Sequence, residues 1–90
     1  MIDENNSKDI KGAIEAMLFM SPRSISLTKI KKEFPKTDID IINIAILDLV
    51  KEYNQKDSAI NVVFDNNKIE MVLKPKYLKY CKFAVSKILT

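Results

Sequence analysis

IEAMLFMSPRSISLTKIKKEF, residues 14–34, interrupts one helical pattern and begins another within a few positions. Apolar residues recur three and four positions apart up to Met20, which is typical of an amphipathic helix. Pro22 predicts the end of that helix, because proline disfavours helical geometry at the residue before it. The segment SIS, residues 24–26, is too short for a helix and has a β-branched centre. We therefore expect one short strand there, with Ile25 facing inward.

Helices are predicted on both sides of this strand. The first begins after Ser7, a good N-cap, and continues to about Met20. Its apolar stripe consists of Ile10, Ala13, Ile14, Met17 and Leu18. The second helix begins at the cap Ser26 and is closed by Pro35. Its inward residues are Leu27, Ile30 and Phe34.

The remainder of the chain predicts a long helix, a hairpin and a last helix. Asp38 is a helix cap, and the helix that follows should span about residues 39–54. Its core stripe is Ile39, Ile42, Ala45, Ile46, Leu49, Val50 and Tyr53. The segments 60–64 and 69–73 alternate like strands, and the asparagines between them tolerate the left-handed geometry of a tight turn. Pro75 then opens a C-terminal helix, residues 75–90, with the stripe Tyr77, Cys81, Ala84, Val85 and Ile88.

The order of elements is helix, short strand, helix, helix, hairpin, helix. A lone strand after the first helix is most easily used as the third partner of the later hairpin, since an isolated hairpin is marginal in water. We therefore predict an α+β fold, a winged helix-turn-helix with a small three-stranded antiparallel sheet. Ninety residues provide one hydrophobic core. The chain is expected to be a single domain over residues 1–90, with residues 1–7 as a flexible N-terminus.

Composition argues against catalysis and metal chemistry. The chain has no histidine, a single cysteine and no glycine-rich phosphate loop, so a nucleophile and base pair or a zinc site cannot be assembled in the usual way. We predict no enzymatic activity, no catalytic residues, no metal and no cofactor. Cys81 is interpreted as a small buried hydrophobe. The polar N-terminus and the lack of a long apolar run predict a soluble cytoplasmic protein that does not contact membranes.

The helix over residues 39–54 occupies the position of a DNA-reading helix, but its outward side is unsuited to that role. Asp40 and Asp48 would repel a phosphate backbone. Large apolar residues also lie outside its core stripe, as one does in the first helix, and exposed apolar clusters mark protein contacts. The candidates for a protein interface are Phe19, Ile41, Ile44 and Leu47. The alternative is that the small domain buries them itself, with Phe19 packing on Ile25.

Lysines supply a second candidate surface. The formal net charge is +3, yet residues 37–70 are net acidic, whereas residues 74–90 hold five lysines and no acid. Contacts to nucleic acid without sequence reading are a possible role for Lys29, Lys31, Lys32, Lys74, Lys76, Lys79 and Lys82, with Tyr77 and Tyr80 as stacking groups. The alternative is a solvated basic face. These lysines motivate a second functional hypothesis, a DNA-binding winged-helix transcriptional regulator.

Over about residues 10–83 the chain resembles a known family, the first winged-helix domain of segregation and condensation protein B, partner of the kleisin in prokaryotic SMC complexes. The similarity depends on the order and spacing of segments rather than on any catalytic motif. Those segments are EAMLF at 15–19, SISL at 24–27, EY at 52–53 and KPKY at 74–77.

The resemblance implies a nucleoid-associated, non-enzymatic adaptor in chromosome condensation and segregation. It implies that the chain forms a homodimer and binds a kleisin and, through it, SMC. Family members usually carry two consecutive winged-helix domains, so the chain is expected to be a fragment or a short form. In the family, kleisin binding depends heavily on the second domain. The resemblance therefore supports dimerisation of this chain more strongly than it supports kleisin binding. The wing glycines of the family are replaced here by DNN, residues 65–67. A turn is still expected there, but the resemblance does not imply the family's wing contacts for this chain.

Overall fold

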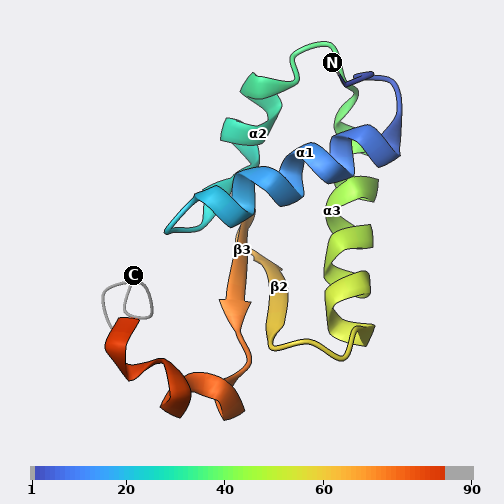
Figure 1. Cartoon of the computed structure of the whole chain (residues 1–90). Helices are drawn as coiled ribbons and strands as arrows, with labels where there is room; N and C mark the ends of the chain where they lie inside the picture. Colours follow the sequence, from blue (N-terminus) through green and yellow to red (C-terminus); the bar gives the residue numbers. More distant parts are fainter. Residues whose placement is uncertain (1, 85–90) are drawn as a thin grey trace.

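The computed structural model describes residues 2–84. Within this range the chain forms helices on one side of a small sheet and a 3₁₀ segment after it (Figure 1). The elements are α1 (Ser7–Met20), β1 (Ile25–Ser26), α2 (Leu27–Glu33), α3 (Ile39–Gln55), β2 (Ile60–Asp65), β3 (Lys68–Leu73) and η1 (Pro75–Ala84). The predicted α+β class and the winged-helix order of elements are confirmed.

The sheet uses the short strand as predicted. Its strand order is β1-β3-β2, and both pairings are antiparallel. Ile25 lies opposite Ile69, so β1 extends the hairpin on the open side of β3. At the hairpin tip, Asn66 and Asn67 have φ values of 51° and 58°, the left-handed geometry that a two-residue turn requires. The interpretation of these asparagines as turn residues is confirmed.

The hairpin tip is attached to the start of α2. The Ser26 hydroxyl accepts a hydrogen bond from the Lys29 backbone N–H at 3.1 Å and caps the helix, as expected. The neighbouring Leu27 N–H donates to the Asn67 carbonyl at 2.8 Å. One short segment therefore ends the sheet, begins the helix and holds the turn.

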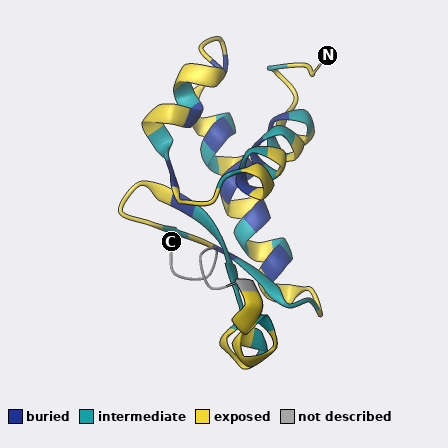
Figure 2. Ribbon diagram, turned by 60° about the vertical axis from the view of Figure 1, so that its left-hand side comes forward, coloured by how far each residue is buried: buried dark blue, intermediate teal, exposed yellow. Residues whose placement is uncertain are grey.

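The core lies between α1, α3 and the sheet, and Figure 2 shows the buried positions along the inner sides of the helices. Its fully buried side chains are Ile10, Ile14, Ile30, Ile42, Ile46, Leu49, Val62 and Ile69. The predicted stripes of α1, α2 and α3 are confirmed except at Ile39, which is exposed. Ile39 is the first residue of α3, before the point at which the helix reaches the core.

The N-terminal segment contacts the loop between α2 and α3. The Thr37 hydroxyl is buried and donates a hydrogen bond to the Glu4 carbonyl at 2.9 Å. The sequence predicts a flexible N-terminus over residues 1–7. Within that segment, Glu4 is bound to Thr37 by this hydrogen bond. The N-cap of α1 is Asn6 instead of Ser7, because the Asn6 side chain accepts from the Lys8 N–H at 2.9 Å.

The C-terminal element differs from the expected core helix. Its described part is a 3₁₀ helix interrupted at Cys81, where φ is −117° and ψ is 21°. Cys81 is half-buried rather than a core residue. The repeat KYL, KYC, KFA over residues 76–84 has a period of three, which matches the 3₁₀ helix and competes with the 3.6-residue stripe. Residues 85–90, with the predicted Val85 and Ile88, lie outside the described residues.

Candidate protein-interaction surface

The outer side of α3 carries an exposed apolar pair. Ile44 and Leu47 are 57% and 60% exposed, three positions apart on one face of the helix. Ile41 differs from them, since it is half-buried and packs against the core. Asp40 and Asp48 are exposed on the same helix. Here we call Ile44 and Leu47, with the two aspartates beside them, the α3 patch.

Phe19 is the second apolar candidate and lies apart from the α3 patch. It is 70% exposed at the C-terminal end of α1, so the domain does not bury it against Ile25. Met20 beside it is also exposed. Figure 1 shows this end of α1 pointing away from α3. The structure therefore separates Phe19 from Ile44 and Leu47.

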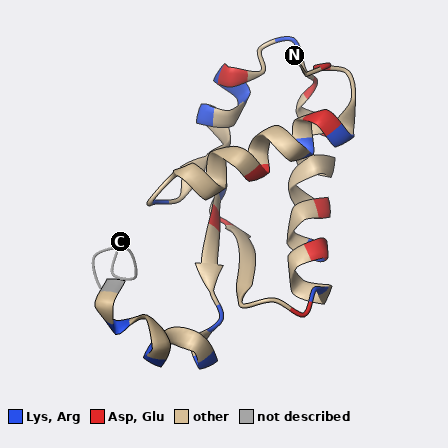
Figure 3. Ribbon diagram, in the orientation of Figure 1, with Lys and Arg blue, Asp and Glu red and all other residues tan. Residues whose placement is uncertain are grey.

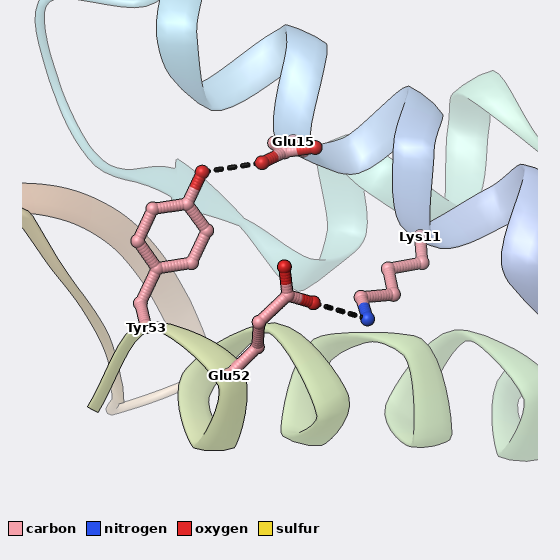
Figure 4. A network of polar contacts seen from close by, with 4 residues as sticks. All are labelled: Lys11, Glu15, Glu52 and Tyr53. Carbon is pink, nitrogen blue, oxygen red and sulfur yellow. Dashed lines mark hydrogen bonds and ion pairs between the residues drawn. The ribbon is translucent and has the colours of Figure 1, made fainter. Parts of the chain in front are cut away.

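Polar contacts fix α3 against α1 and so orient the α3 patch (Figure 4). The Tyr53 hydroxyl donates to the Glu15 carboxylate, and Lys11 forms an ion pair with Glu52. The hydrogen bond to Glu15, together with burial, raises the pKa of Tyr53 to about 12. The contact between Lys11 and Glu52 raises the pKa of the ammonium group and lowers the pKa of the carboxyl.

The candidate lysines form two groups at opposite ends of the molecule, on α2 and in the C-terminal segment (Figure 3). Two of them are engaged with backbone carbonyls. The Lys31 ammonium donates to the Pro35 and Thr37 carbonyls, and the Lys74 ammonium donates to the Lys56 carbonyl at 3.2 Å. The exposed lysines of the two groups are Lys29, Lys32, Lys76, Lys79 and Lys82.

Sequence reasoning missed an aromatic residue beside these lysines. Phe83 is 91% exposed, the highest value among the large exposed hydrophobic residues in the described part of the chain. The signal that identifies it is the three-residue repeat, which places an aromatic residue directly after each lysine of η1.

No group of histidine, cysteine or acidic side chains among residues 2–84 is placed to hold a metal ion. No helix in the same range is both long and apolar enough to cross a bilayer.

Comparison with known proteins places this chain in a family. The family model for the segregation and condensation complex subunit ScpB matches residues 12–89. The crystal structure of ScpB from Mycobacterium tuberculosis superposes with a TM-score of 0.76 at 13% identity, covering 92% of this chain and 51% of that one. The chain thus spans about half the length of that relative. No curated protein matches by sequence. On the family match, the chain belongs to the segregation and condensation complex subunit ScpB family.

Proposed function

We propose that this chain is a non-enzymatic adaptor of an SMC–kleisin complex, acting in chromosome condensation and segregation through homodimerisation and protein binding. Family membership supports the cellular role. Action through protein binding is supported by the α3 patch, in which Ile44 and Leu47 expose more than half of their surface. Exposed aliphatic side chains on an ordered helix favour contact with another protein.

The chemistry of the α3 patch favours a protein partner over DNA. Ile44 and Leu47 have no groups that hydrogen-bond to base edges, and major-groove reading depends on such bonds. Asp40 and Asp48 place negative charge on the helix that would have to approach the phosphates. The chemistry of α3 therefore does not support the hypothesis of a DNA-binding transcriptional regulator. The proposed partners are a second copy of the chain, a kleisin and, through the kleisin, SMC. The proposed location is the cytoplasm, at the nucleoid.

Sedimentation of the purified chain at tens of micromolar tests the dimer. We expect a dimer for the wild type and a monomer for Ile44→Asp or Leu47→Asp, because each buries an unpaired charge in the interface. Val63→Asp is the matched control, since Val63 is an exposed apolar residue on β2, and this variant should remain dimeric. Circular dichroism checks that all variants fold. A monomeric wild type, or a dimer unaffected by both α3 variants, overturns the dimer proposal.

The complex is tested separately by recovering the tagged chain from its native cells and identifying what comes with it. Kleisin and SMC subunits are the expected partners. Recovery of neither subunit, from cells in which both are present, contradicts the adaptor role even if the chain dimerises.

A further inference from the structure

The 3₁₀ segment η1 contains a repeat that matches its own helical period. Residues 76–78, 79–81 and 82–84 read KYL, KYC and KFA, so each triplet is a lysine, an aromatic and an apolar residue. In a 3₁₀ helix, side chains three positions apart lie directly above one another. The first two triplets therefore stack lysine on lysine and tyrosine on tyrosine. The third follows the kink at Cys81.

The lysine row consists of Lys76 and Lys79, and Lys82 follows beyond the kink at Cys81. All three lysines are exposed. From residue 74 to residue 84 the chain has no acidic residue, and Figure 3 shows lysines but no Asp or Glu among the charged positions of η1. The Lys76 ammonium lies 5.3 Å from the centre of the Tyr77 ring, and the Lys79 ammonium lies 5.1 Å from that of Tyr80. Positive charge and aromatic surface are thus repeated together along the segment.

The aromatic row consists of Tyr77 and Tyr80, and Phe83 follows beyond the kink at Cys81. Tyr80 is 67% exposed and Phe83 is 91% exposed, and neither belongs to the hydrophobic core. Tyr77 is half-buried. In Figure 2, η1 extends beyond the sheet with mostly exposed positions. Packing within the described part of the chain therefore does not account for these two rings.

We propose that η1 is a binding site for single-stranded nucleic acid. Proteins that bind single strands without sequence preference combine cations that follow the phosphates with aromatic rings on which bases stack. The two rows of η1 supply both components on one segment. A single strand is favoured over a duplex, because the bases of a duplex are already stacked on each other and offer no free face to Tyr80 or Phe83. It is favoured over a membrane surface, because insertion of the Tyr77 or Tyr80 ring into the bilayer would carry the lysine ammonium beside that ring out of water.

Fluorescence anisotropy of the whole chain with labelled oligo(dT) at low salt tests this site. We expect Tyr80→Ala and Phe83→Ala each to weaken binding about fivefold or more, because a stacking partner is lost. Phe19→Ala removes a ring elsewhere that is about as accessible as that of Tyr80, and it should leave the affinity unchanged. Oligo(U) of equal length distinguishes RNA from DNA as the source of the strand. Binding of either one that depends on Tyr80 and Phe83 supports the site.

The lysine row has its own matched comparison. Lys79→Gln should reduce the slope of log affinity against log salt by about 0.7, the value for one lost phosphate contact to a single strand. Lys8→Gln on α1 removes an exposed lysine that is not among the candidate nucleic-acid contacts, changes the net charge equally and should leave the slope intact. Binding that is insensitive to Tyr80 and Phe83, equal loss in the two lysine variants, or binding only to duplex DNA or to anionic lipid vesicles overturns the proposal.

Discussion

The hydroxyl of Tyr53, near the C-terminal end of α3, donates a hydrogen bond to the carboxylate of Glu15 on α1. The adjacent ion pair between Lys11 and Glu52 joins the same two helices. A tyrosine that also contributes its ring to the core therefore closes the interface between α1 and α3 with a polar bond. Three predictions follow from this contact and from the hairpin tip.

Replacement of Tyr53 by phenylalanine should lower the free energy of unfolding by about 1 kcal/mol. The ring stays in the core, while one hydrogen bond to a charged acceptor is lost. Urea denaturation measures the change. In a Glu15→Ala background the same substitution should have little effect, because the acceptor is already gone. An equal loss in both backgrounds would show that the bond does not stabilise the fold.

Alkaline pH should remove this contribution. The pKa of Tyr53 is raised to about 12 in the folded chain, and an unfolded tyrosine ionises near pH 10. The protonated phenol is favoured in the folded state, so the stabilisation is complete below about pH 10 and is lost as the pH rises towards about 12. Tyrosinate absorbance should show an ionisation near pH 12 that Tyr53→Phe lacks. An unchanged titration in that variant would contradict the assignment.

Replacement of Asn67 by glycine should raise the free energy of unfolding by about 0.5 to 1 kcal/mol. Asn67 has a φ of 58°, which glycine adopts without the steric cost paid by other residues, and Asn-Gly is the preferred pair for this turn. The bond from the Leu27 N–H to the carbonyl of residue 67 involves only the backbone and is retained. Thermal denaturation measures the gain. Asn54→Gly inside α3 is the control and should lower stability by about 0.3 kcal/mol, the difference in helix propensity between asparagine and glycine.

Local signals in the sequence predicted most of the fold. Ser26 caps α2 with its own hydroxyl, and Pro22 is followed directly by the turn into β1, so short segments determine both features. The asparagine pair has the geometry of a tight turn, which a few residues are sufficient to specify. These features needed no information about distant parts of the chain.

Exposure on α3 and the form of η1 were harder to predict. Ile41 and Ile44 have the same chemistry, but Ile41 packs against the core and Ile44 is mostly exposed. That difference depends on which elements cover the helix, and a helical pattern alone does not contain it. In η1 two periodicities compete, and the stripe through Tyr77 and Cys81 predicted a helix type that the described residues do not adopt.

The three-residue period of η1 makes its surface depend on how the backbone is wound. In an α-helix the same triplets would fall about 60° short of a full turn at each repeat, so lysines and rings would spiral around the axis instead of forming rows. The residues of the segment would be the same, but the lysines and the aromatic rings would no longer be aligned in rows. Before the kink at Cys81, the side chains of η1 therefore form aligned rows only while the segment keeps its tighter coil, and backbone conformation acts there as part of the recognition chemistry.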